Sequence, residues 1–113
     1  MKLRGGSFNV RYNKIPVKSQ ELPRIKTQMP PSVYIPPGHT LILYDPDAPG
    51  GTYIHWLVGK KTYLSYKPPS PPKGIHRYIF KLVEGEPLYI PERVGNPDII
   101  PGRVKGSVMF YSR

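Results

Sequence analysis

The sequence predicts an all-β fold, and three observations lead to that prediction. The longest segment without Pro or Gly is only ten residues, 75–84, and helix interiors tolerate both residue types poorly. The chain has a single alanine, Ala48. The segments between the prolines and glycines are short and rich in β-branched and aromatic residues, which is typical of strands. We therefore expect strands joined by turns, with at most one helical turn.

Seven segments have this composition, and we expect each to form a strand: 7–12, 32–35, 40–44, 52–58, 63–66, 75–83 and 105–111. The first two are short stretches of β-branched and aromatic residues. The third contains the continuous apolar run Leu41–Tyr44, and such a run predicts a strand covered on both faces, as at the centre of a two-layer sandwich. The fourth places His55 and Trp56 inside an apolar run, and the fifth begins and ends with tyrosine.

The sixth expected strand, 75–83, is the longest of the seven. In segment 75–83 alternate side chains point to opposite faces, so His76, Tyr78 and Phe80 share one face. Segment 105–111 ends in the apolar run Val108–Tyr111, which has the same appearance as the run in the third strand.

Three stretches rich in Pro and Gly separate the strands: Pro36–Gly38, Pro49–Gly51 and Pro68–Gly74. Pro fixes φ and removes a hydrogen-bond donor, whereas Gly permits positive φ, so each stretch predicts a turn or a stiff loop. No internal repeat or linker interrupts the sequence. Its 113 residues predict one domain, 1–113.

Composition excludes several classes of protein. The absence of Cys excludes disulfide-stapled scaffolds and zinc sites with cysteine ligands. No stretch approaches 18 apolar residues, which excludes a transmembrane helix. The first six residues have no apolar run behind their charges and do not resemble a signal peptide, so we expect a cytoplasmic protein.

The net charge of +10 draws the chain toward anions, and most of the excess lies in the first third. Residues 1–44 hold a single acid, Glu21, against seven basic side chains: Lys2, Arg4, Arg11, Lys14, Lys18, Arg24 and Lys26. These form either a solvated face or a patch for acidic lipid, RNA or DNA. A nucleic-acid partner is disfavoured, because no zinc finger, basic heptad helix or Gly-rich RNA-binding strand motif is present.

Two acids follow the apolar run of the third strand. Asp45 and Asp47 are two residues apart, so in an extended chain both side chains would face one site. The alternative is a turn in which the Asp side chains accept hydrogen bonds from backbone N–H groups beside Pro46 and Pro49.

Two further clusters contain histidine. His55 lies beside the single Trp of the chain, and a lone histidine on a strand is more often a structural hydrogen-bonding residue than a ligand. His76 follows the proline-rich stretch 68–74, which would hold backbone donors rigidly at the start of its strand. That stretch could also serve as a polyproline ligand, but the apolar strand after it disfavours this interpretation.

Three motifs occur in order along the chain: Asp45–Pro49, His55–Val58 and Gly74–Tyr78. Together they resemble the phosphatidylethanolamine-binding protein family. The resemblance extends over nearly the whole chain and is strongest over residues 41–83. With 113 residues, the chain resembles a short member of that family.

The resemblance implies a mostly antiparallel β-sandwich with a small anion pocket at one end. It assigns to the pocket, by position in the motifs, Asp45, Asp47, His55, His76 and Tyr78, with Pro69, Pro71 and Gly74 at the rim. Tyr and His side chains and backbone N–H groups can donate hydrogen bonds to phosphate oxygens. A carboxylate beside a histidine favours the protonated ring, so anion affinity should rise as the pH falls.

The chain also departs from the family pattern. Only five residues separate Pro49 from His55, so part of the usual pocket wall is expected to be replaced by Tyr53. The C-terminal helix of the family has no counterpart in the sequence.

We therefore expect a non-enzymatic protein that binds phosphatidylethanolamine or phosphoethanolamine head groups or other small anions, without metal or cofactor. An unidentified protein partner and peripheral contact with an anionic membrane would accompany this role. The alternative is a basic nucleic-acid or membrane-surface binder that acts through the N-terminal third. A metal-dependent hydrolase built on the Asp and His side chains is less favoured, because no Ser or Cys nucleophile motif accompanies them.

Overall fold

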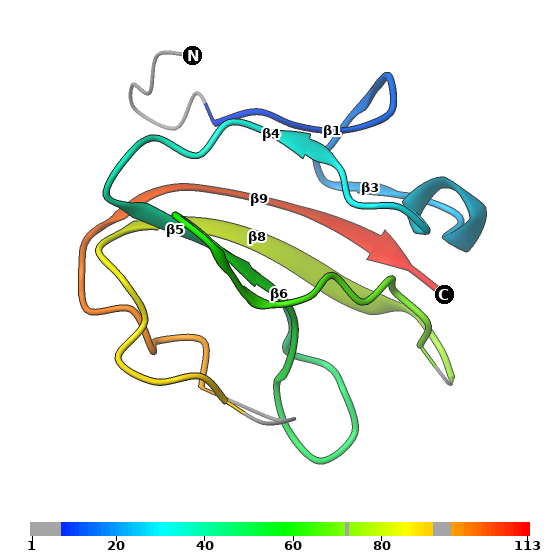
Figure 1. Cartoon of the computed structure of the whole chain (residues 1–113). Coiled ribbons are helices and arrows are strands. Elements are labelled where there is room, and N and C mark those ends of the chain that lie inside the picture. Colours follow the sequence, from blue (N-terminus) through cyan, green and yellow to red (C-terminus); the bar gives the residue numbers. More distant parts are fainter. Residues whose placement is uncertain (1–7, 72, 92–95) are drawn as a thin grey trace.

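The computed structural model describes residues 8–71, 73–91 and 96–113, and it is a two-layer β-sandwich (Figure 1). The smaller sheet has the strand order β2-β1-β4, and the larger has the order β3-β9-β8-β5-β6-β7. The strands are β1 (Val10–Tyr12), β2 (Ile15–Pro16), β3 (Gln20–Glu21), β4 (Ser32–Val33), β5 (His39–Asp45), β6 (Tyr53–Val58), β7 (Thr62–Leu64), β8 (His76–Glu84) and β9 (Val104–Ser112).

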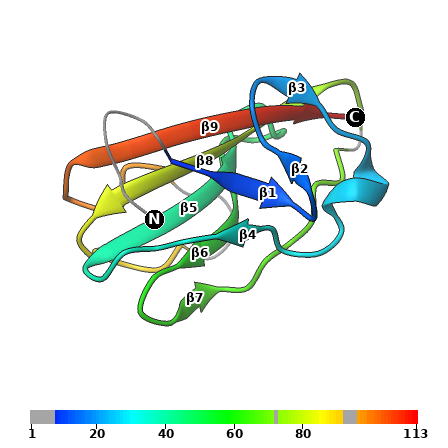
Figure 2. The same ribbon diagram turned by 90° about the horizontal axis from the view of Figure 1, so that it is seen from above.

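The all-β prediction is confirmed, and the pairing is mostly antiparallel. Among the described residues, β3 and β9 form the one parallel pair. A 3-10 turn, η1 (Arg24–Thr27), connects β3 to β4 and is the one helical element in this part of the chain. Figure 2 shows the smaller sheet lying across β5, β8 and β9 of the larger one.

The central strand β5 explains the continuous apolar run in the sequence. Leu41 and Leu43 pack between the two sheets, whereas Ile42 and Tyr44 pack on the outer face of the larger sheet. The outer face is covered by Ile99 and neighbouring residues of the connection between β8 and β9 rather than by another sheet. Both faces of β5 are therefore buried, as predicted.

Aromatic side chains hold the two sheets together. Tyr12 of the smaller sheet packs against Phe80 and Phe110 of the larger one, with ring centroids 6.1 and 5.5 Å apart. Phe80 and Tyr78 alternate along β8 with exposed or half-buried residues, so the predicted alternation of that strand is confirmed. The same inward face carries His76 at the start of β8.

The sequence did not predict β2, β3 or η1. Two of these are two-residue pairings, and Pro16 of β2 cannot donate to a ladder, so they depend on the partner strand rather than on local composition. Strand β4 is shorter than predicted, because the chain leaves the sheet after Val33. At residue 7 the first predicted strand extends beyond the described residues.

A chain of hydroxyl groups connects the smaller sheet, the segment after β7 and η1. Tyr66 donates to the carbonyl oxygen of Thr27 at 2.6 Å, and this leaves its oxygen to accept from Tyr12 at 2.7 Å. Burial raises the pKa of Tyr66 to about 12, so its hydroxyl stays protonated and able to donate. These two bonds fix η1 against the segment that follows Tyr66.

Replacing Tyr66 with Phe should destabilise the fold by about 1–3 kcal/mol, because it leaves two buried partners without their hydrogen bonds. Urea unfolding followed by fluorescence measures the loss. The control is Tyr63→Phe, since Tyr63 bonds the exposed Glu86 and its removal should leave the unfolding midpoint unchanged. Equal stability of the Tyr66→Phe variant and the unmodified protein would show that the hydroxyl chain does not contribute.

Candidate functional site

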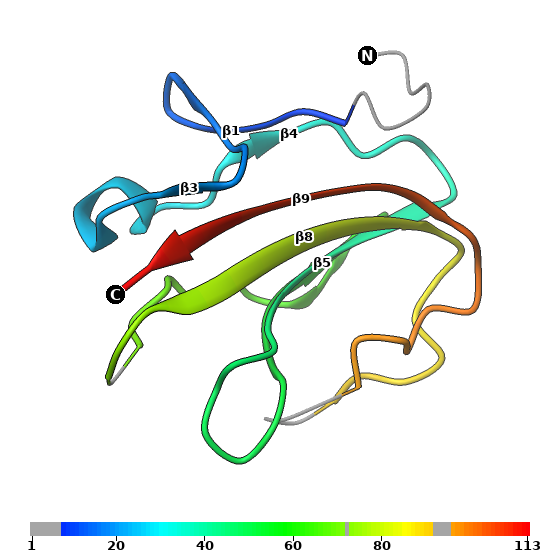
Figure 3. The ribbon, with the colours of Figure 1, turned by 180° about the vertical axis from the view of Figure 1, so that it is seen from behind.

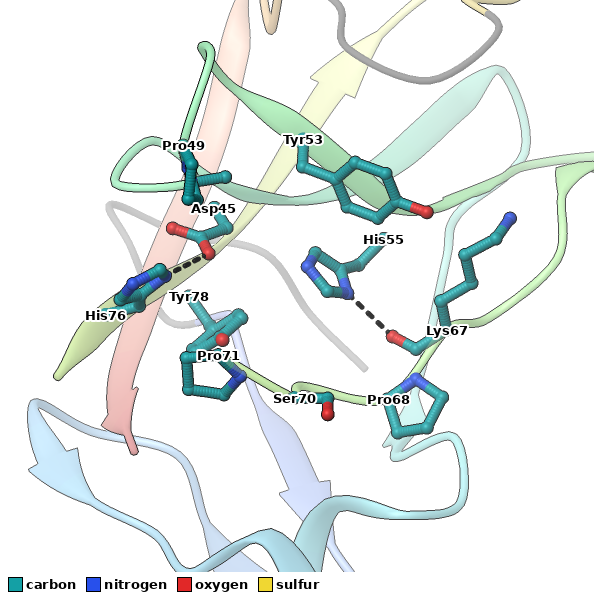
Figure 4. Close-up of a pocket in the computed structure, with 11 residues that line it drawn as sticks. Asp45, Pro49, Tyr53, His55, Lys67, Pro68, Ser70, Pro71, His76 and Tyr78 are labelled. Carbon is teal, nitrogen blue, oxygen red and sulfur yellow. Dashed lines mark hydrogen bonds and ion pairs between the residues drawn. The ribbon is translucent and has the colours of Figure 1, made fainter. Parts of the chain in front are cut away.

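A cavity of about 260 Å³ lies at the end of the sandwich where β5 ends and β8 begins (Figure 4). We call it the end cavity. Its lining residues are Asp45, Ala48, Pro49, Tyr53, His55, Lys67, Pro68, Ser70, Pro71, His76 and Tyr78. They come from β5, the β5–β6 turn, β6, the segment after β7, and β8.

Asp45 is buried at the end of β5, and both of its carboxylate oxygens have partners. One oxygen accepts the backbone N–H of Asp47 at 2.8 Å, which closes a local turn. The other lies 2.7 Å from Nδ1 of His76. The negative charge of Asp45 is therefore compensated within the protein.

His76 is held between two oxygen acceptors. Its Nδ1 faces Asp45, and its Nε2 lies 3.2 Å from the carbonyl oxygen of Lys73. A carboxylate oxygen can only accept, so the ring carries a proton on Nδ1 and donates it to Asp45. Gly74 has φ of +74°, and this left-handed turn brings the Lys73 carbonyl back to the ring.

His55 is the second histidine of the end cavity and has different surroundings. Its Nδ1 donates to the carbonyl oxygen of Lys67 at 2.8 Å, which assigns the ring proton to Nδ1 and leaves Nε2 without one. Burial lowers the pKa of His55, so the ring is neutral at pH 7. Tyr53 and Tyr78 pack edge-on against it, with centroids 4.8 and 5.3 Å away.

Tyr78 forms the floor of the end cavity between the two histidines. Its ring stacks on Phe110 with centroids 5.3 Å apart, which fixes its position on β8. Burial, followed by the nearby charge of Asp45, raises the pKa of Tyr78. The hydroxyl therefore remains a donor at physiological pH.

Asp47 does not line the end cavity, so the expectation that both aspartates face one site differs from the structure. Its carboxylate accepts from the backbone N–H of Arg77 at 2.8 Å, from Arg77 Nε at 3.0 Å and from Nη2 at 2.8 Å. These hydrogen bonds to Arg77 hold the pKa of Asp47 below its usual range. The chain turns after Asp45, and Asp47 thereby meets the outward face of β8.

The segment 67–71 forms one wall and is tied to the rest of the site. Lys67 donates its backbone N–H to the carbonyl oxygen of His55 at 2.8 Å. Of the three predicted rim residues, Pro71 lines the end cavity. Pro69, which is buried, and Gly74, which is exposed, do not line it and instead shape the loop. Pro72, between the predicted rim residues, lies outside the described residues.

Sequence reasoning missed five lining residues: Ala48, Pro49, Lys67, Pro68 and Ser70. Ala48 and Pro49 lie within the motif Asp45–Pro49, and Lys67, Pro68 and Ser70 lie in or next to the proline-rich stretch 68–74, so membership of these stretches was the available signal. Ser70 adds a hydroxyl and Lys67 adds a cation to the donor groups around the end cavity. The sequence-predicted wall residue Tyr53 does line it.

The basic residues of the N-terminal third do not converge on the end cavity. Lys2 and Arg4 lie outside the described residues. Arg11, Lys14, Lys18 and Lys26 are exposed on the smaller sheet and its connections. Arg24 is different, because it donates to the carbonyl oxygens of Pro71 and Arg113 and so joins η1 to the wall of the end cavity.

The structure also bears on metal binding and membrane insertion. Within residues 8–71, 73–91 and 96–113, no group of three or more His, Cys, Asp or Glu side chains is placed to hold a metal ion. Over the same residues, no helix has the length and apolar character needed to cross a membrane.

The chain is similar in sequence to two plant proteins. No family model matches it. It is 34% identical to TERMINAL FLOWER 1 of Arabidopsis thaliana over 97 residues, covering 66% of this chain and 55% of that protein. It is 37% identical to BROTHER of FT and TFL 1 from the same plant over 59 residues, 38% of this chain and 33% of that protein. The chain thus spans about half the length of the first relative and a third of the second.

A solved structure has the same fold. It is a Chlamydia trachomatis protein described as a phosphatidylethanolamine-binding protein homologue, with a TM-score of 0.52 and 17% sequence identity. The match covers 91% of this chain and 94% of that one. The sandwich described above is therefore shared along almost its whole length.

Replacing Asp45 with Asn should destabilise the protein by about 1–3 kcal/mol, because the single amide oxygen cannot accept from both His76 and the Asp47 N–H, and one buried donor loses its partner. Urea unfolding at pH 7 measures the difference. The matched control is Asp47→Asn at the half-exposed pair with Arg77, which should lose no more than about 1 kcal/mol. Equal losses in the two variants would contradict the buried pair.

Proposed function

Because the chain belongs to the phosphatidylethanolamine-binding protein family, we propose that its end cavity binds small phosphate-bearing ligands without catalysing a reaction. The observation that carries the proposal is the buried pair of Asp45 and His76, because both oxygens of this carboxylate are occupied by donors of the protein. A carboxylate without such partners would repel an anion more strongly, and the pair also holds the wall in place.

Four residues that line the end cavity carry donor groups. These are the hydroxyls of Tyr78 and Ser70, the ammonium of Lys67, and the His55 ring once its Nε2 carries a proton. Phosphate oxygens accept such bonds, and charged donors make the stronger ones. A volume of about 260 Å³ suits a small anion or head group, because pockets for drug-sized ligands begin near 300 Å³.

The absence of catalysis is part of the proposal, and it rests on how the polar groups are used. Both ring nitrogens of His76 are bonded to oxygen acceptors, so neither is free to accept a proton from a nucleophile. His55 lies among aromatic rings, and in the described part of the chain Ser70 makes no hydrogen bond to either histidine that would activate it. Incubation with p-nitrophenyl phosphate and with phosphoethanolamine tests this, since phosphate release at rates above the buffer would contradict it.

The bound anion should arrive together with a proton on His55. The free ring is neutral, because burial lowers its pKa, and its Nε2 lone pair would face the anion. An anion favours the protonated ring, so affinity should rise as the pH falls from about 7, by at most about tenfold per pH unit. Below the lowered pKa of the free ring the affinity should level off. The other charged groups at the wall are the Asp45–His76 pair and Lys67.

Sulfate is the probe for this effect, because its charge stays constant between pH 5 and 8 whereas a phosphate monoester titrates near pH 6. Calorimetry should show sulfate affinity increasing as the pH falls for the unmodified protein. The variant His55→Asn keeps an amide N–H toward Lys67 and should show no pH dependence. A slope that persists in this variant would place the titrating proton elsewhere and contradict the role of His55.

The end cavity should recognise the phosphate group and not the amine of a head group. The oxygens of Asp45 are occupied by His76 and the Asp47 N–H, and those of Asp47 are occupied by Arg77, so no carboxylate is free for an ammonium. Calorimetry should give affinities for inorganic phosphate and phosphoethanolamine that agree within about threefold. Ethanolamine alone should not bind, and preference for the amine-bearing ligand by more than tenfold would contradict this reading.

A further inference from the structure

Two large apolar side chains protrude from the region of η1. Ile25, within η1, is 76% exposed, and Met29, just after it, is 75% exposed. Both lie on a short turn whose position is fixed from inside, because Thr27 between them is fully buried and its carbonyl accepts from Tyr66. The turn therefore presents these side chains to the surroundings from a rigid base.

The same surface carries cations without counter-ions. Arg11, Lys14, Lys18 and Lys26 have no ion pair among the described residues. All six acids in the described part of the chain are paired with other basic side chains: Glu21, Asp45, Asp47, Glu84, Glu86 and Asp98. Four cations without an ion pair therefore lie on η1, the smaller sheet and its connections, whereas Lys61, Lys67 and Lys73, also without one among the described residues, lie elsewhere.

The apolar and cationic side chains belong to one continuous surface. Ile25, Lys26 and Met29 border a hollow of about 480 Å³ that also includes Ser32. Ser32 borders a second, shallower hollow together with Arg11. We call this surface, formed by η1 and the outer side of the smaller sheet, the η1 surface.

The η1 surface adjoins the end cavity. Arg24 of η1 donates to the carbonyl oxygen of Pro71, which lines that cavity, and Tyr66 connects η1 to the segment leading into the same wall. Figures 1 and 2 both show η1 and the segment after β7 at the end of the sandwich that carries the C-terminus. A surface that contacts η1 therefore comes close to the entrance of the end cavity.

We propose that the η1 surface docks the protein on an anionic lipid bilayer, with Ile25 and Met29 entering the interfacial layer and Lys26 and Arg11 facing anionic head groups. Aliphatic side chains favour transfer to the acyl boundary, and basic side chains beside them favour an anionic leaflet. Single-stranded nucleic acid is the poorer fit, because bases stack on aromatic rings and not on Ile or Met. This inference does not depend on what the end cavity binds.

Sedimentation with vesicles tests the proposal in the full chain. Vesicles of phosphatidylcholine with 30% phosphatidylglycerol should bind the protein, and vesicles of phosphatidylcholine alone should bind it at least about tenfold more weakly. Ile25→Glu should reduce binding to the anionic vesicles by about tenfold or more, because it removes apolar contact and adds a repelling charge. Lys26→Gln should weaken binding by a smaller factor and reduce its sensitivity to salt.

The matched control is Leu88→Glu. Leu88 is 69% exposed, and the loop that carries it lies at the other end of the sandwich (Figures 1 and 3). Leu88→Glu changes the net charge by the same amount as Ile25→Glu, so it should alter vesicle binding only through that change in charge. Equal losses for Ile25→Glu and Leu88→Glu would overturn the proposal, and so would equal binding to the two kinds of vesicle. Tight binding of a single-stranded oligonucleotide would also overturn the proposal, in favour of nucleic acid, under two conditions. Lys26→Gln must weaken that binding, and Ile25→Glu must weaken it no more than Leu88→Glu does.

Sulfate calorimetry on the Ile25→Glu variant separates the two proposals. An unchanged sulfate affinity with lost vesicle binding supports a docking surface distinct from the end cavity. Loss of sulfate binding as well would show that the substitution disturbs the end cavity, and would overturn the assignment to the η1 surface.

Discussion

The hydrogen bond between Asp45 and His76 joins the end of β5 to the start of β8, and the end cavity depends on it. The ladder between β5 and β8 pairs Tyr44 with Ile79, which brings the two ends together. The bond then fixes the first inward side chain of β8 against the last residue of β5. Without it, two polar groups would remain buried at the wall with no compensation, and burial of an unpaired charge is strongly unfavourable.

This pair also changes the meaning of the unusual charge balance. A protein with ten more basic than acidic side chains attracts anions over its whole surface, yet the acidic group at the cavity wall is occupied by partners within the protein. The attraction there comes from placed donors, such as the Tyr78 hydroxyl, and from a histidine that can accept a proton. Other cations without an ion pair, Arg11 and Lys26 among them, lie on the η1 surface, where exposed Ile25 and Met29 accompany them. The end cavity, which would select the ligand, and the η1 surface, which would attract an anionic membrane, are therefore different parts of the molecule.

Much of the sandwich follows from sequence, because the long strands carry their own signal. The run Leu41–Tyr44 predicted burial on both faces, and alternation placed His76 and Tyr78 on one inward face of β8. The short pairings of β2 and β3 could not be predicted, since two residues have no periodicity and their partners are distant in sequence. The direction of Asp47 was also beyond local reasoning, because it is set by Arg77, thirty residues away. The ligand, the compartment and the protein partner remain predictions.

The most direct measurement of the account is nitrogen NMR of the histidine rings at pH 6.5, with and without sulfate. The chain has three histidines, and His76 should keep a proton on Nδ1 in both conditions, because that nitrogen donates to the Asp45 carboxylate. His55 should change from a neutral ring protonated at Nδ1 to a doubly protonated ring when sulfate is added. Absence of a proton on Nδ1 of His76, or sulfate binding that leaves His55 neutral, would contradict the account.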